Sequence, residues 1–188
     1  DRLSFIQRKA VGKRVFDLGA LDETAFASKQ DRGNWLHAKL GLHAENVVGI
    51  DNSKLLPSDG LVTGAGGRVV RSGRFLRGPV IEAYGRPAPV VAGGVLEHLP
   101  DTLGFLHSLK RNEGLRGVEF VFSTPNACCW HNGFVGLAGM ESMHVDHLQI
   151  YSYKTLRTLF GNAGIELEEL VPYHARFYEM IEGASGAK

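Results

Sequence analysis

Five short apolar runs, separated by longer segments with helical character, constrain the fold of this chain most. The runs are rich in β-branched and aromatic residues and nearly continuous, which is typical of strands with both faces buried beneath helices. We expect five strands, at Arg14–Leu18, Asn46–Ile50, Arg68–Arg71, Pro89–Ala92 and Val118–Ser123. The alternation of strands and helices predicts an α/β fold, in which a mostly parallel sheet is flanked by helices in three layers, α/β/α.

One of the expected helices is well delimited. Tyr153–Ala163 follows Ser152, a residue type suited to the N-cap, and precedes Gly164, which can end a helix. After it, Ile165–Val171 alternates apolar and acidic residues, which predicts an edge strand with one solvated face. We expect the other helices at Glu23–Lys29, Asn34–Leu42 and Leu96–Arg111.

Composition favours a single domain over residues 1–188 and excludes several classes of protein. The chain of 188 residues is long enough to bury a hydrophobic core without help from a disulfide or a metal. It has neither a membrane-spanning apolar run nor a leader, so we expect a cytoplasmic protein. The adjacent Cys128 and Cys129 fit neither a disulfide framework nor paired zinc-binding motifs, which favours a reducing compartment. A formal net charge of +1 argues against a protein that coats nucleic acid.

The turn after the first expected strand is a candidate ligand site, because open α/β sheets bind ligands where the strand order reverses. The turn runs from Asp17 to Asp22, and Gly19 within it permits a sharp bend and a close approach of a ligand. One glycine does not make a GxGxxG loop, which disfavours a nicotinamide or flavin dinucleotide. An ordinary strand-to-helix turn with Asp22 as N-cap is the alternative.

The second expected strand ends in an acidic residue, Asp51, followed by Asn52. A carboxylate at a strand end can accept both hydroxyl hydrogens of a ribose. The alternative is that Asp51 only forms the turn before Asn52.

Two more strand ends complete an ordered set of motifs. The segment Val95–Asp101 (VLEHLPD) follows the fourth expected strand, and Thr124–Asn126 (TPN) ends the fifth. Together with the acidic-Leu-Gly turn at Asp17–Gly19 and the GxD ending at Gly49–Asp51, these motifs resemble those of class I S-adenosylmethionine-dependent methyltransferases, in a branch that methylates small molecules. The resemblance runs from about Arg14 to Val171 and includes His144–His147 (HVDH).

The resemblance implies a Rossmann-like fold, the cofactor S-adenosyl-L-methionine, and methyl transfer to an oxygen or nitrogen of a small-molecule acceptor. Asp17 and Gly19 would lie beside the methionine part of the cofactor, and Asp51 would bind the ribose hydroxyls. Asn52 would pack near the adenine. The cofactor-binding residues that the resemblance implies are Asp17, Gly19, Ala20, Leu21, Asp22, His37, Asp51, Asn52, Gly73, Arg74, Gly94, Val95 and Glu97.

A hydroxyl acceptor would also need a base. His147 and His144 are the first candidates and His98 the third, because histidine titrates near neutral pH. His147 and His144 follow the fifth expected strand, in an expected acceptor-site loop at 126–150; a merely polar surface loop is the alternative. No metal is expected. The less favoured metal site would combine His131, His144, Asp146 and His147.

Three positions depart from the pattern of the family. Leu21 stands where a second glycine is usual, Arg74 where a carboxylate commonly meets the adenine, and Gly94 where close relatives often carry an acid. The departures keep open a second hypothesis, a catalytically weak or inactive cofactor-binding or scaffold protein. A third, an NAD(P)-dependent oxidoreductase, rests on the α/β pattern alone.

The partner we expect is a small molecule, with neither membrane nor nucleic acid involved. Arginines recur at every third position from Arg68 to Arg77, a spacing that does not align them on one side of a strand, so an anionic acceptor stays a minor alternative. Little of the chain lies outside the expected sheet. A small or partly exposed acceptor, or a lid from a second subunit of a homodimer, would suit such a chain.

Overall fold

A six-stranded sheet organises the first of two compact units of this chain. The computed structural model describes residues 1–21, 26–72 and 78–173. The first unit comprises Asp1–Val95 and Arg111–Ser123, and the second comprises Leu96–Lys110 and Thr124–Lys188.

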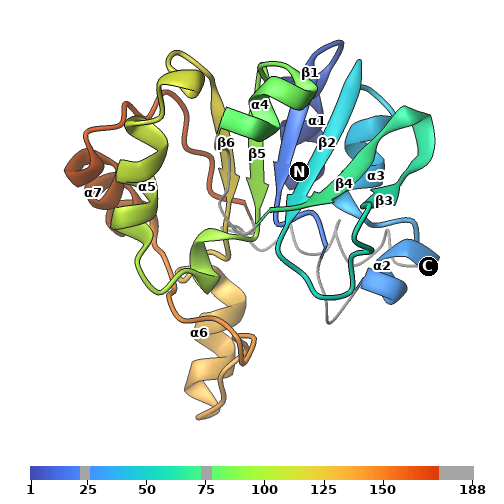
Figure 1. Ribbon diagram of the computed structural model, residues 1–188. Helices are drawn as coiled ribbons and strands as arrows, with labels where there is room; N and C mark the ends of the chain where they lie inside the picture. Colours follow the sequence, from blue (N-terminus) through green and yellow to red (C-terminus); the bar gives the residue numbers. More distant parts are fainter. Residues whose placement is uncertain (22–25, 73–77, 174–188) are drawn as a thin grey trace. The chain divides into compact units, whose positions relative to one another are not determined.

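The sheet is parallel except at one edge (Figure 1). Its strand order is β3-β4-β2-β1-β5-β6, and only the pairing of β3 with β4 is antiparallel within the part of the chain that the structure describes. The order therefore reverses between β1 and β5, as the Rossmann-like α/β prediction requires. The strands are β1 (Arg14–Leu18), β2 (Asn46–Asp51), β3 (Leu61–Val62), β4 (Arg68–Arg71), β5 (Val90–Gly93) and β6 (Phe120–Ser123).

The neighbouring strands β2, β1 and β5 end within one residue of the same register. Leu18 in β1 lies opposite Ile50 in β2 and Ala92 in β5. The residues that follow these three positions therefore leave the sheet at one edge, which brings the turns after β1, β2 and β5 together. The predicted burial on both faces is confirmed for β1, β2 and β5 but not for β4, whose Arg68 and Arg71 are exposed.

Helices lie on both faces of the sheet. α1 (Arg2–Ala10) and α3 (Leu36–Gly41) pack on one face, where Ile6 and Leu40 join Val47 of β2 in a buried cluster. Figure 1 shows α4 on the opposite face. The remaining helical segments of this unit are α2 (Phe26–Asp31), α4 (Gly78–Tyr84), η1 (Gly64–Gly66) and η3 (Glu113–Leu115).

The second unit is helical in its described part. α5 packs against α7, and the Lys110 Nζ donates a hydrogen bond to the Gly164 carbonyl oxygen at 2.7 Å. The prediction for α7 is confirmed at both ends: Ser152 and Thr155 form a capping box, and Gly164 has a φ of 63°. The helices are η2 (Leu96–His98), α5 (Thr102–Lys110), α6 (Trp130–Leu137) and α7 (Tyr153–Ala163).

Three expectations about segments of the second unit were wrong. The helix expected at Leu96–Arg111 is divided into η2 and α5, because Pro100 lacks an N–H donor and disfavours helical backbone before it. Ile165–Val171 forms no strand among the described residues, because alternation decides only where side chains point and supplies no partner backbone. The expected loop at 126–150 contains α6, whose two glycines weaken the helical signal.

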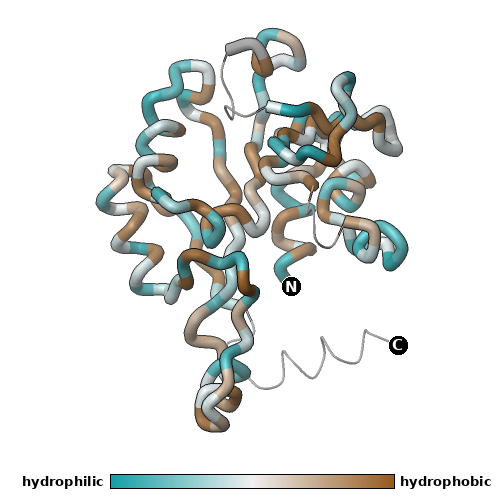
Figure 2. The backbone as a smooth tube through the Cα atoms, turned by 60° about the horizontal axis from the view of Figure 1, so that its bottom comes forward, coloured by the Kyte–Doolittle hydropathy of each residue, from teal (hydrophilic) through white to brown (hydrophobic). Residues whose placement is uncertain are grey.

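Hydrophobic residues concentrate along the strands but are also present on α6 and the segment after it (Figure 2). There Phe134, Leu137 and Met140 are 63%, 87% and 62% exposed. Within the described ranges, no helix combines the length and the apolar character that crossing a bilayer requires.

Candidate functional site

Two glycines lie where the strand order of the sheet reverses, one after β1 and one after β5. Gly19 follows β1 with a φ of 66°, and Gly94 follows β5 with a φ of 83°. The Gly19 N–H donates to the Ile50 carbonyl oxygen at 2.9 Å, and the Gly94 N–H donates to the Ser123 carbonyl oxygen at 2.8 Å. A Cβ on Gly19 would lie 2.9 Å from the Val95 Cγ2, so the chain needs glycine here.

Asp51, at the end of β2, holds the turn after β1. Its side chain is only 5% exposed, and its Oδ2 accepts a hydrogen bond from the Leu21 N–H at 2.8 Å. Its Oδ1 accepts from the Ser53 N–H, also at 2.8 Å. The carboxylate lies at the sheet edge where the resemblance places a ribose.

Leu21 takes part in the packing of the same turn. It is 6% exposed and belongs to a cluster with Trp35, Leu56 and Val69. The Trp35 indole N–H donates to the Ala20 carbonyl oxygen at 2.6 Å. Side-chain packing and this hydrogen bond thus stabilise the turn at the position where the family usually has a glycine.

Asp17 and His37 form a closed polar group inside the first unit, together with Thr63. Asp17 is 2% exposed and His37 is 1% exposed. The His37 Nδ1 lies 3.1 Å from the Asp17 Oδ2, and its Nε2 lies 3.2 Å from the Thr63 Oγ1. Both ring nitrogens therefore have partners within the protein, and the group links β1 to the segment before η1.

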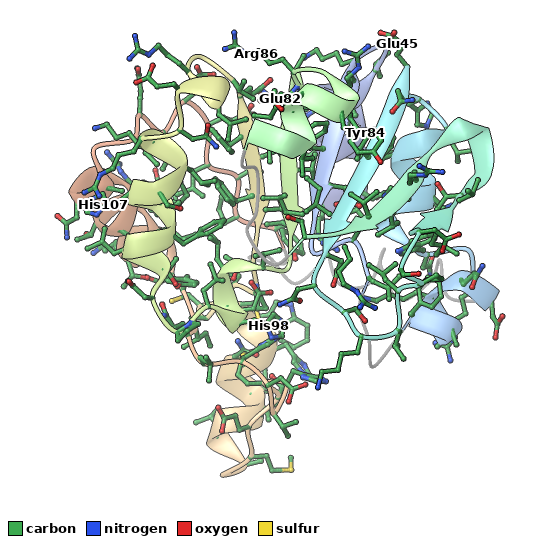
Figure 3. The ribbon with its side chains drawn as sticks, in the orientation of Figure 1. Glu45, Glu82, Tyr84, Arg86, His98 and His107 are labelled. Atoms are coloured by element: carbon green, nitrogen blue, oxygen red, sulfur yellow. The ribbon has the colours of Figure 1, made fainter. Side chains whose placement is uncertain are left out.

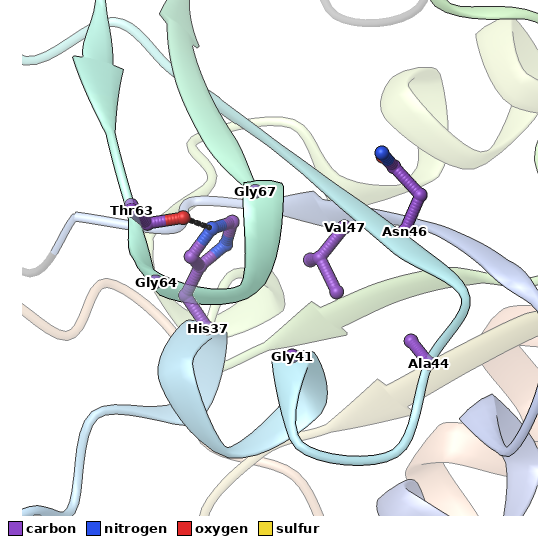
Figure 4. A pocket seen from close by; sticks show the side chains of 8 residues that line it. All are labelled: His37, Gly41, Ala44, Asn46, Val47, Thr63, Gly64 and Gly67. Atoms are coloured by element: carbon purple, nitrogen blue, oxygen red, sulfur yellow. Dashed lines mark hydrogen bonds between the residues drawn. The ribbon is translucent and has the colours of Figure 1, made fainter.

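A small recess borders this group (Figure 4). His37, Gly41, Val47 and Thr63 are among its lining residues, and it has room for about one water molecule. Sites for small-molecule ligands usually have volumes of about 300 Å³ or more, so the recess is no cofactor site.

Glu97, His98 and His147 come together in the second unit. Figure 3 labels His98, on the η2 turn that follows β5. One donor atom from each of the three residues lies within 4.8 Å of the other two. The rings of His98 and His147 meet edge to face, with their centroids 4.8 Å apart.

His144 lies at the margin of this cluster. Its side chain is 49% exposed, and its Nδ1 lies 3.5 Å from an Asp146 carboxylate oxygen. Its ring centroid is 5.6 Å from that of His147. The structure therefore brings together His98 and His147 of the three candidate bases, with His144 beside them, and adds Glu97, which we had expected to bind the cofactor.

A buried hydroxyl pair that the sequence did not indicate lies in the same unit. The Thr102 Oγ1 and the Tyr151 hydroxyl oxygen are 2.8 Å apart, and Tyr151 is 6% exposed. Burial raises the pKa of Tyr151 above 10.0, the hydrogen bond from Thr102 lowers it, and the charge of Glu97 raises it further. Tyr151 lies within the segment that carries the resemblance, but only the structure reveals that Thr102 is its partner.

Three of the expected cofactor residues lie outside the described part of the chain: Asp22, Gly73 and Arg74. A fourth, Asn52, follows β2, and its side chain is exposed.

The described residues offer a carboxylate and side-chain-free backbone of the kind that S-adenosylmethionine would need. Asp51 supplies a carboxylate at the expected strand end, and Gly19 forms a turn that a Cβ would fill. Gly94 likewise presents backbone without a side chain.

The topology defines a Rossmann-like α/β fold, which two solved structures share. A presumed methyltransferase from Bacillus halodurans C-125 matches with a TM-score of 0.53 and 15% identity, over 90% of this chain and 70% of that one. The YcgJ protein of Bacillus subtilis matches with a TM-score of 0.50 and 12% identity, over 86% and 67%. At such identities the likeness is one of fold alone. No protein-family model and no curated protein matches the sequence significantly.

Proposed function

We propose that this chain is an S-adenosylmethionine-dependent methyltransferase that moves a methyl group to an oxygen or nitrogen of a small molecule. The observation that carries the proposal is the position of Asp51. Its carboxylate ends β2 beside the strand-order reversal and holds the glycine-containing turn after β1. The fold that the chain shares with the presumed methyltransferase from Bacillus halodurans supports the same function.

In this function the residues of the turn bind and orient the cofactor. Asp51 accepts hydrogen bonds from the ribose hydroxyls, while Gly19 and Gly94 let the backbone approach. The cofactor supplies an electrophilic methyl group on a sulfonium. Alignment of the two reactants is the main contribution of the protein, and it can lower the barrier by about 7 to 11 kcal/mol.

A hydroxyl acceptor must also lose its proton. His147, His144 and His98 are the groups that we propose for this step, because imidazole titrates near neutral pH. Removing such a proton typically accelerates transfer by about 10² to 10⁴. The segment 126–150, which carries two of these histidines, would contact the acceptor.

Leu21 favours a second candidate, a cofactor-binding or scaffold protein without activity on the same fold. Its side chain is packed into the cluster beneath the turn, where the family usually has a glycine. Binding without methyl transfer would distinguish this candidate from the enzyme.

Isothermal titration calorimetry of the full chain with S-adenosylmethionine and S-adenosylhomocysteine tests the proposal. We expect both to bind, and we expect Asp51→Ala to weaken binding by at least about tenfold, since a hydrogen bond to a charged group contributes about 1.5 to 3 kcal/mol. Asp59→Ala is the matched control, because Asp59 is an exposed acid in the segment that follows β2. Binding of NAD or NADP in place of these ligands, or no binding up to millimolar concentration, would contradict the proposal.

A further inference from the structure

We propose that Glu97, His98 and His147 bind a divalent cation of the first transition row, such as Zn²⁺ or Co²⁺. One donor atom from each residue lies within 4.8 Å of the others. Bonds from such a cation to nitrogen or oxygen are about 2.0 to 2.2 Å long, so donors on one cation are roughly 3 to 4 Å apart. The donor atoms would need to approach each other by up to about 2 Å.

The burial and the hydrogen bonding of Glu97 are the first observation that points to a bound cation. Its side chain is 3% exposed, and its Oε2 has no hydrogen-bond partner among the described residues. A buried carboxylate oxygen without a partner is costly, and buried charges in proteins are normally paired or bound to metal. A cation would supply the partner that Glu97 lacks.

His98 is oriented as metal-binding histidines are. Its Nδ1 lies 3.1 Å from the backbone carbonyl oxygen of Asp146. A carbonyl oxygen can only accept, so the Nδ1 carries the hydrogen and the Nε2 keeps its lone pair. Histidines that bind metals usually donate their other N–H to a carbonyl or carboxylate in this way.

His147 completes the set. Its Nδ1 is buried and has no hydrogen-bond partner in the part of the chain that the structure describes. The next two residues, Leu148 and Gln149, donate their backbone N–H groups to the Glu97 carbonyl oxygen at 2.8 and 3.1 Å. These two hydrogen bonds keep His147 beside Glu97, so the donor set is assembled before any cation arrives.

The donor set indicates the class of cation. Two imidazoles and one carboxylate suit zinc and neighbouring transition metals, whereas magnesium and calcium prefer oxygen ligands alone. Three protein ligands also leave coordination positions open, as in catalytic rather than structural sites. This step rests on the proposed function: an open position would take an oxygen of the acceptor and lower the pKa of a hydroxyl there. With His98 and His147 bound to the cation, His144 would be the base that takes the proton.

Metal binding to the full, chelator-treated chain tests the inference without any methyl donor. We expect one Zn²⁺ per chain by calorimetry, and one Co²⁺ with a visible d–d absorption band typical of mixed nitrogen and oxygen ligands. We expect Glu97→Gln and His147→Asn to weaken Zn²⁺ binding by at least about 100-fold, more than losing an outer-shell partner usually does. Mg²⁺ should not compete.

His107→Asn is the matched control, because His107 lies on α5 in the same unit and outside the cluster (Figure 3). It should bind Zn²⁺ as the unmodified chain does. Should Glu97→Gln fail to fold by circular dichroism, His98→Asn replaces it, since His98 is exposed.

The inference is overturned if the chain shows no saturable binding up to millimolar Zn²⁺, or if the cluster variants bind as tightly as His107→Asn. Binding of S-adenosylmethionine without binding of Zn²⁺ would support the proposed function and contradict the metal site. Binding of Zn²⁺ without binding of S-adenosylmethionine would support the metal site and contradict the proposed function.

Discussion

Two groups of histidine and carboxylate side chains lie in this protein, one in each unit, and they differ in how completely they are bonded. In the first, both ring nitrogens of His37 have partners, Asp17 and Thr63. In the second, Glu97 Oε2 and His147 Nδ1 are buried without hydrogen-bond partners among the described residues. The same residue types are therefore bonded differently in the two units. A closed group stabilises the fold, whereas an open one indicates a ligand.

Removing one histidine from each group should separate the two roles most clearly. His37→Ala leaves the buried Asp17 without its imidazole partner, and losing one member of a buried pair costs about 3 to 5 kcal/mol. His98→Ala, at an exposed position, should change the free energy of unfolding by no more than about 0.5 kcal/mol. Urea denaturation of the metal-free chains measures both. Equal losses would remove the distinction between the groups.

The turn beside the closed group should be nearly as sensitive. Gly19→Ala forces a left-handed backbone on a residue with a Cβ and brings that atom within 2.9 Å of Val95, so we expect a loss of about 2 to 3 kcal/mol. Gly12→Ala is the control, because Gly12 has a φ of 64° but open space around its Cβ position. It should cost only about 1 kcal/mol. Similar thermal unfolding shifts for both variants would show that Val95 moves aside freely.

The open group should respond in the opposite direction. Glu97→Gln replaces a buried carboxylate, whose Oε2 lacks a hydrogen-bond partner among the described residues, with a neutral amide, so in the absence of metal we expect the chain to become more stable by about 1 kcal/mol. Glu113→Gln, at a position whose side chain is 77% exposed, should have no measurable effect on urea denaturation. A destabilised Glu97→Gln chain would mean that the carboxylate is already satisfied without a cation.

The smallest effect concerns the ionisation of Tyr151. Burial raises its pKa, and Glu97 raises it further, so Glu97→Gln should lower the pKa of Tyr151 relative to the unmodified chain. A tyrosine whose pKa is raised by folding contributes stability below its unfolded-state pKa, about 10, and this stability is lost as the pH rises through the folded-state pKa. In the Glu97→Gln chain the loss should be smaller and be complete at a lower pH, because only the folded-state pKa changes. Ultraviolet difference titration, with Tyr151→Phe as the reference, measures the shift. If the pKa of Tyr151 is unchanged in the Glu97→Gln chain, the charge of Glu97 does not influence its ionisation.

Much of the sheet could be predicted because its signals are local. β1 and β4 have the predicted bounds. β1 is buried on both faces and carries a continuous apolar run, whereas β4 was predicted from its two valines alone. α7 was predicted from its caps, which need only neighbouring residues. α1 was missed, although Ile6 and Ala10 lie four positions apart on its buried face.

The candidate site was predictable only in part. Asp51 and Gly19 occupy strand ends, and the order of the motifs alone suggested their position. Nothing in the sequence indicated that Leu21 packs with Trp35, or that Tyr151 lies beside Thr102. Such partners are set by packing between segments far apart in the chain.

The sequence by itself determined the α/β class, the strand-end positions and the kinds of side chain available, because periodicity and capping act over a few residues. Only the tertiary structure decided which histidines and carboxylates meet. His98 and His147 share a cluster because backbone hydrogen bonds join the segment after His147 to Glu97. Whether such a cluster is closed or open depends on the burial and bonding of each atom, which no local pattern encodes.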